Sequence, residues 1–431
     1  MKAQYLLAGA AALALATSAY ADVTVDITGA TAFRVAALET IKARFVASGQ
    51  PFKFAHSSAA GGFNGATRAI FIGTFPGVSG TTTIRTSFNG SVEGISALVD
   101  SPAKDPTYLL PSVLNGTTAA VGGTELAGTS SPVAADQSEI AFSDVSISAT
   151  PLKGNLQPAD PAAGVVVFTM IASESAPTSL SNVTSQQFRA LFGAGLQPLS
   201  LFTGLAADGA ITAVAAGRND GSGTRTSYLA ETGYGISNPV QQYITTASTS
   251  TEITQIRRTR QHDGGTAAAP GPNASIIWGQ DIDGNGGYSS GSNLRTDLGK
   301  TSANVTILDA DGSDLYGGAV PITLISWLSA GDAVPARQAG AKILGYNGVT
   351  LESLKTQTTL DAADRAKVTN GQYTAWSYQQ MYRRGDITSG DAVTVYNGIK
   401  NGFTAATLGA TGIPIADMNV GRQVDGGVVG P

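Results

Sequence analysis

Cysteine is absent from the 431 residues, and histidine occurs only twice, at His56 and His262. The absence of cysteine excludes disulfides, thiol catalysis and cysteine-bound metal sites. Residues 287–291 spell the Gly-x-Ser-x-Gly of many hydrolases, but that catalytic triad needs a histidine after the serine, and both histidines precede it. With no complete triad and no complete set of metal ligands in the sequence, we expect a protein that is not an enzyme and holds no cofactor.

Charged residues are also scarce, at 13% of the chain, and acids outnumber bases by 31 to 26. Binding to nucleic acid requires basic patches that neutralise phosphate groups, so this balance argues against a nucleic-acid partner. A small anion needs only a local site, and the formal net charge of −5 is compatible with one.

A long apolar run occurs once, near the N-terminus, over residues 6–16. Lys2 precedes it, and the small-x-small triplet of residues 19–21 follows it, as in a secretory signal peptide. The run is too short to span a membrane. We therefore expect residues 1–21 to be removed, which takes the formal charge from −5 to −6, and the protein to be periplasmic or secreted.

Glycine is abundant, at 53 residues, and the most informative glycines lie in residues 217–225, Gly-Arg-Asn-Asp-Gly-Ser-Gly-Thr-Arg. An apolar run that favours a strand, 211–216, precedes this stretch, and a run that favours a helix, 226–231, follows it. Glycines and a helix N-terminus can direct several N–H groups at one point, and Arg218 and Arg225 add charge. The stretch predicts an anion-binding cradle; the alternative is an ordinary turn with two solvated arginines.

Three further segments repeat the order of strand, polar turn and helix. Residues 23–27 predict a strand, 28–33 a turn and 35–46 a helix; residues 82–88 predict a strand that enters a helix through 89–98. Residues 139–148 predict a strand that ends in a polar turn.

The rest of the chain supplies elements that connect these units. We expect a central strand at 164–170, a capped helix at 182–192, a buried segment at 320–328 and core aromatics at 373–382. Residues 101–137 predict an insertion or long surface loop. Two segments, 281–286 and 309–314, begin like calcium loops but lack the glutamate at the twelfth position, which favours turns and no metal.

The stretch Asp220-Gly221-Ser222-Gly223-Thr224, with Arg218 two residues before the aspartate, resembles the anion-binding loop of periplasmic phosphate-binding proteins. These are the solute receptors of ABC phosphate importers, with the type II periplasmic-binding-protein fold. Residues 29–33, Gly-Ala-Thr-Ala-Phe, resemble the threonine-bearing turn at the start of that family, and are one residue longer. The segment around Asp144 resembles the family's Gly-Ala-Ser-Asp segment.

The resemblance implies a set of ligand-binding residues. It implies that Asp144 accepts a hydrogen bond from the proton of hydrogen phosphate, which selects against fully ionised oxyanions. Ser91 matches the family's serine, with Ser57 and Ser58 as competing candidates; the alternative for Ser91 is a plain helix cap, and for Asp144 a turn or helix cap. The complete implied set is Thr31, Ser91 and Asp144 from one lobe and Arg218, Ser222, Gly223 and Thr224 from the other.

The resemblance also implies the fold and the function. We expect an α/β protein of two lobes with a ligand cleft between them: residues 22–164, with an insertion near 101–137, then 165–370, then a return and tail at 371–431. The implied function is a monomeric solute-binding protein that delivers phosphate or a similar tetrahedral oxyanion to the permease of an ABC importer. The alternative is a secreted structural or surface protein that keeps the fold without binding phosphate.

Overall fold

The computed structural model describes residues 22–58, 62–99, 105–260, 282–409 and 412–431. The expected signal peptide and the first residue of the calcium-like segment 281–286 lie outside these ranges. Among the described residues, no helix has the length and apolar character needed to cross a membrane.

A mixed sheet of 15 strands runs through the described part of the chain. Its main path is β12 (Leu196–Pro198), β13 (Thr212–Ala215), β17 (Ile322–Ser329), β10 (Gly164–Ala172), β19 (Trp376–Arg384), β8 (Ile140–Ser143), β1 (Val23–Gly29), β4 (Thr82–Ser87), β3 (Arg68–Gly73), β2 (Lys53–His56) and β6 (Thr124–Leu126). Four strands pair off this path: β9 (Leu156–Pro158), β11 (Asn182–Val183), β18 (Lys342–Tyr346) and β20 (Gly412–Ile413). Two smaller sheets are formed by β14 (Tyr243–Ser248), β15 (Ile253–Arg258) and β16 (Thr306–Leu308), and by β5 (Thr107–Leu109) and β7 (Val133–Ala135).

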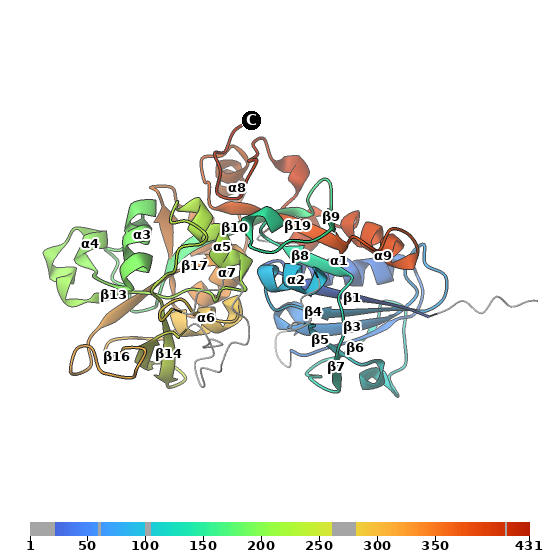
Figure 1. Ribbon diagram of the computed structural model, residues 1–431, viewed down its shortest axis with the longest axis horizontal. Helices are drawn as coiled ribbons and strands as arrows, with labels where there is room; N and C mark the ends of the chain where they lie inside the picture. The colour runs from blue at the N-terminus through green and yellow to red at the C-terminus, as the bar shows by residue number, and fades with distance from the viewer. Residues whose placement is uncertain (1–21, 59–61, 100–104, 261–281, 410–411) are drawn as a thin grey trace, which may run out of the picture.

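Most of the labelled helices lie in two groups, one on each side of the molecule, and α8 lies above and between them (Figure 1). The α-helices of the described residues are α1 (Arg34–Ala47), α2 (Ser91–Leu98), α3 (Ser185–Ala194), α4 (Ser200–Thr203), α5 (Gly223–Glu231), α6 (Gly291–Leu298), α7 (Ala330–Gln338), α8 (Ala362–Thr369), α9 (Asp391–Lys400) and α10 (Ala405–Leu408). The α/β class expected from the sequence is therefore confirmed.

Two long antiparallel strands, β10 and β19, join the two groups (Figure 1). The first residues of β10 pair with β19, and its last residues pair with β17 and β18. In the same way, β19 pairs first with β10 and then with β8 and β9. We call the elements around β1, β4 and β8 lobe 1, and those around β13 and β17 lobe 2. One hydrophobic cluster extends through both lobes.

The parallel strands of lobe 1 bring three polar turns to one edge. Strand β1 pairs in parallel with both β4 and β8, so the carboxyl ends of all three strands lie at the same edge of the sheet. Thr31, Ser91 and Asp144 each follow one of these strands. Ligands of open α/β sheets bind at such an edge, and here lobe 2 contacts it.

Most of the predicted elements are confirmed, with shifts of a few residues at their ends. The helix of the cradle starts at Gly223 and not at residue 226, because Ser222 caps it. The prediction for 101–137 was wrong in part: within the described residues of this segment, β5 pairs with β7, and β6 extends the main sheet beside β2. Three-residue strands leave little periodicity in the sequence, which is why they were missed.

Three acids, of which Asp26 is buried, lie close together around Arg85 in lobe 1. The Asp26 backbone N–H on β1 donates to Glu139 Oε2 at 2.6 Å, and Arg85 on β4 donates to the Asp26 carboxylate and to Asp136 Oδ2, the latter at 2.7 Å. Burial outweighs the Arg85 contact and raises the pKa of Asp26 to about 6, and burial raises the pKa of Glu139 to about 7.

We expect the free energy of unfolding to fall as the pH rises from about 4 to about 7. In this range the folded chain holds protons on Asp26 and Glu139 that the unfolded chain has lost, so a rising pH favours unfolding. Glu139→Gln keeps an acceptor for the Asp26 N–H but removes the charge, and we expect it to reduce this fall by about 1–2 kcal/mol, since Glu139 is partly exposed. Urea titrations at pH 4.5 and 7.5 measure the effect.

The control for this experiment is Glu352→Gln, at a carboxylate whose side chain is 62% exposed. This variant is expected to keep the pH dependence of the unmodified protein. An equal change in both variants would contradict a specific contribution from Glu139.

Candidate functional site

The cradle begins two residues after the end of β13 and leads directly into α5. Ser222 is the N-cap: its Oγ accepts a hydrogen bond from the Arg225 N–H at 3.3 Å. Arg225 is buried. Its Nη1 donates a hydrogen bond to the carbonyl oxygen of Asn285, and its Nη2 donates one to Asn285 Oδ1. Arg225 therefore holds the loop against residue 285 and does not face an anion site, contrary to the sequence interpretation.

The side chain of Arg218, which belongs to lobe 2, forms hydrogen bonds with both lobes. Its Nε donates to the Tyr288 carbonyl at 3.0 Å, its Nη2 to the Ser289 carbonyl at 2.9 Å, and its Nη1 to Thr31 Oγ1 at 3.1 Å. A guanidinium has five N–H donors, so these three bonds leave two. The two carbonyls fix the side chain in lobe 2, and Thr31 is its contact in lobe 1.

Asp144 lies at the N-terminus of α5, which belongs to the other lobe. Ser91 Oγ donates to Asp144 Oδ1, and Thr224 Oγ1 donates to Asp144 Oδ2 at 3.3 Å. A methyl group built on Gly223 would lie 1.8 Å from Asp144 Oδ1. Only glycine at this position lets the carboxylate approach the start of the helix so closely.

A second contact between the lobes lies at the N-terminus of α2. The carbonyl of Gly221 accepts the N–H groups of Val92, at 3.1 Å, and of Glu93, at 3.3 Å. The N-cap of α2 is Gly90, with no side-chain cap bond, so the alternative that Ser91 is a plain cap is wrong. Its hydroxyl bonds Asp144 instead.

We call the contact between Thr31, Ser91 and Asp144 of lobe 1 and residues 218–224 of lobe 2 the junction. Burial is the largest influence on the pKa values of its charged groups. It raises the pKa of the Asp144 carboxyl, while the Ser91 hydroxyl and the charge of Arg218 act in the opposite direction. Burial also lowers the pKa of Arg218, whose charge Asp332 and Asp144 favour. An acid and a cation thus lie buried at the same lobe junction.

The structure therefore brings six of the seven predicted residues to the contact between the lobes, and the seventh, Ser222, caps α5 within lobe 2. Ser91, Asp144, Gly223 and Thr224 touch one another, and Arg218 pairs with Thr31. The competing candidate Ser57 has its hydroxyl beside Thr67 and bonded to the Arg68 N–H, between β2 and β3. That these residues bind a ligand remains a prediction.

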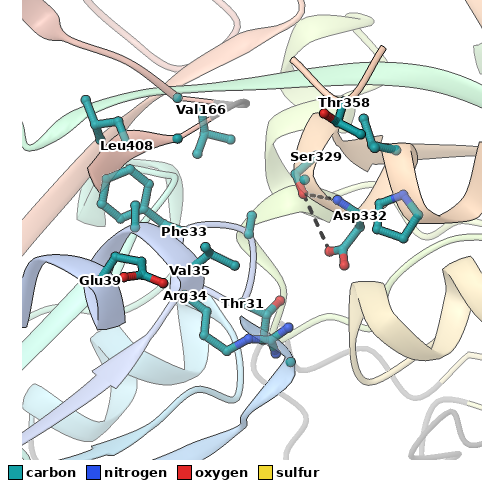
Figure 2. A pocket seen from close by; sticks show the side chains of 18 of the residues that line it. Thr31, Phe33, Arg34, Val35, Glu39, Val166, Ser329, Asp332, Thr358 and Leu408 are labelled. Carbon is teal, nitrogen blue, oxygen red and sulfur yellow. Dashed lines mark hydrogen bonds between the residues drawn. The ribbon is translucent and has the colours of Figure 1, made fainter. Parts of the chain in front are cut away.

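A cavity of about 720 Å³ lies beside this contact, between the lobes. Figure 2 shows Thr31, Arg34 and Val35 on one side and Ser329, Asp332 and Thr358 on the other. Of the seven predicted residues, Thr31 alone lines it.

The sequence interpretation missed the charged residues of this cavity wall, which are Arg34, Glu39, Arg295 and Asp332. Arg34, at the first position of α1, donates to Ser292 Oγ in lobe 2 at 3.2 Å, and Arg295 donates to Asp332 at 3.1 Å. The available signal was the position of Arg34, which directly follows the turn that carries Thr31.

We expect Gly223→Ala to lower the free energy of unfolding by about 1–3 kcal/mol, because the added methyl group overlaps the Asp144 carboxylate and displaces it from α5. Urea denaturation measures this loss. The matched control is Gly193→Ala in α3, where the nearest atom would be 3.6 Å away and alanine suits the helix. An equal loss in both variants would contradict the assigned contact.

Comparison with known proteins gives likenesses of structure only. No family model matches the chain, and no curated protein is similar to it in sequence. One similar solved structure, from Clostridium perfringens, is assigned as a phosphate ABC transporter substrate-binding protein and has bound phosphate; it is 13% identical over 91% of this chain and 99% of its own, with a TM-score of 0.41. An ABC-type phosphate transport receptor from Vibrio cholerae is 10% identical over 88% of this chain and 93% of its own, with a TM-score of 0.38.

Proposed function

We propose that the protein is an extracytoplasmic solute-binding protein for phosphate or a similar tetrahedral oxyanion, and that it delivers the ion to an ABC importer. The observation that carries the proposal is the junction itself. Two lobes joined by paired strands meet at a buried arginine, a buried aspartate and the glycine-rich N-terminus of α5.

The junction offers the donors that an oxyanion needs. Within the described residues, the N–H groups of Gly223 and Thr224 at the start of α5 make no hydrogen bond, and Arg218 keeps two donors. The hydroxyls of Ser91 and Thr31 lie beside them. Backbone donors, a helix N-terminus and a guanidinium together suit a compact anion.

Asp144 lies beside Gly223 at the start of α5. We infer that the anion takes the place of this carboxylate at the helix N-terminus, and that Asp144 then accepts the proton of hydrogen phosphate. A fully ionised oxyanion has no proton to donate and would meet the carboxylate with repulsion. The lobes would open and close around the ion by bending at β10 and β19.

A second candidate is a secreted structural protein that keeps the fold without binding. One observation favours it: the Gly221 carbonyl already satisfies two N–H groups of α2. A titration with phosphate separates the two candidates, because a structural protein would not bind.

We expect Arg218→Ala to weaken phosphate binding at least about 100-fold, since it removes the charged donor of a buried site. The measurement is calorimetric titration of protein freed of ligand by unfolding and refolding. Because alanine also leaves the Tyr288 and Ser289 carbonyls unpaired, Arg218→Lys serves as a second variant, which keeps the charge.

The control is Arg189→Ala, at an exposed arginine of lobe 2 that donates to the Thr232 carbonyl. It is expected to bind phosphate as the unmodified protein does. Unchanged phosphate affinity in a folded Arg218→Ala variant would overturn the assignment of the site.

We expect the unmodified protein to prefer phosphate over sulfate, and Asp144→Asn to reduce this preference roughly tenfold or more, because an amide can donate to sulfate where a carboxylate repels it. Competition titrations with the two anions test this. Asp208→Asn, at an acid of lobe 2 that accepts from Ser179 and lies outside the junction, is the control. Equal selectivity in Asp144→Asn and the unmodified protein would remove the role of Asp144.

A further inference from the structure

The cavity between the lobes is larger than a tetrahedral oxyanion requires. Its volume of about 720 Å³ falls within the range of sites for small organic molecules. Phosphate has only five non-hydrogen atoms and would occupy a small part of such a space. A ligand that carries an organic group would fill this cavity better than phosphate alone.

Thr31 connects the cavity with the junction described above. Thr31 lines the cavity, and its Oγ1 accepts a hydrogen bond from Arg218 Nη1 at 3.1 Å. A ligand bound to Arg218 beside Thr31 would have the cavity as neighbouring space on the side of α1 and α7. Figure 2 shows Thr31 at the lower edge of the cavity, facing Asp332.

Part of the cavity wall is apolar. Val35, which is 39% exposed, and Pro335, which is partly exposed, present apolar surface, whereas Phe33, Val166 and Leu408 line the cavity with only 2–3% of their surface exposed. Leaving apolar surface in water is unfavourable, so an apolar occupant would gain free energy by covering it.

The cavity wall carries equal numbers of cationic and acidic side chains. The cations are Arg34 and Arg295 and the acids are Glu39 and Asp332. Arg295 forms an ion pair with Asp332. The cavity itself therefore gives no net attraction to a second charged group on the ligand.

We propose that the ligand is a phosphate monoester whose uncharged organic group fills this cavity while its phosphate binds at Arg218. The proposal rests on the proposed function, since it assigns the phosphate to that site. It goes beyond it by naming an organic phosphate as the substrate class in place of the inorganic ion.

Titration calorimetry with inorganic phosphate and phenyl phosphate at about pH 5 tests the proposal, because a phosphate monoester loses its last proton at about pH 6 and at about pH 5 still carries the proton that Asp144 would accept. The protein is expected to bind phenyl phosphate at least tenfold more tightly than phosphate. A tenfold preference corresponds to about 1.4 kcal/mol, slightly below what burial of a phenylalanine-sized side chain supplies.

Val35→Trp fills the cavity from the α1 side and is expected to reduce the affinity ratio of phenyl phosphate to phosphate at least tenfold. The matched control is Val46→Trp, which places the same side chain at the other end of α1, where Val46 is 47% exposed and outside the cavity wall. Ala406→Trp in α10 fills the cavity from another element, should Val35→Trp not fold.

Each outcome decides the proposal. A tenfold preference that the folded filling variants remove, and that Val46→Trp keeps, supports it. Binding of phosphate with no preference for phenyl phosphate, or a preference that survives in a folded filling variant, overturns it and leaves the proposed function standing. Binding of neither compound overturns both.

Discussion

The buried carboxylate of Asp144 constrains the arrangement of the two lobes. A carboxylate removed from water needs hydrogen-bond donors and a nearby positive charge. Ser91 supplies one donor from lobe 1, and Thr224 supplies another from the start of α5 in lobe 2. The charge of Arg218 acts on the same carboxylate. Because two of these groups belong to the opposite lobe, the contact between the lobes compensates the burial of the acid.

The pairing of β10 with β19 makes this contact geometrically possible. Both strands pass from one lobe to the other, and each pairs with strands of both lobes, so the two halves share one sheet and one hydrophobic cluster. The junction and the cavity lie between the lobes, where a bend of these two strands would change both. A ligand that touches both lobes would therefore act on this bend.

The junction and the cavity differ in chemistry. The junction holds closely packed polar groups, with Gly221 and Gly223 in contact with lobe 1. The cavity is roomy and partly apolar, and its four charged residues cancel in number. A compact anionic group suits the first, and an uncharged organic group suits the second. Thr31 is the residue that belongs to both.

The amino-acid sequence by itself determined the strands and helices that lead into the site, because local periodicity, glycines and caps act over a few residues; the three-residue strands within 101–137 left no such signal. The alternation at residues 23–27 became β1, and Thr184 with Gln187 forms a capping box at α3. It also indicated the cradle and the three turns that meet it, through a resemblance in chain order.

The tertiary structure alone decided which partner each polar group takes. Arg218 and Arg225 stand seven residues apart in one glycine-rich stretch, yet one crosses to Thr31 and the other is held by Asn285. The same holds for Ser91, which bonds Asp144 in place of its own helix. These partners lie 53 to 187 residues away along the chain. Contacts over such separations form only when the sheet and the lobes are assembled, and no local pattern encodes them.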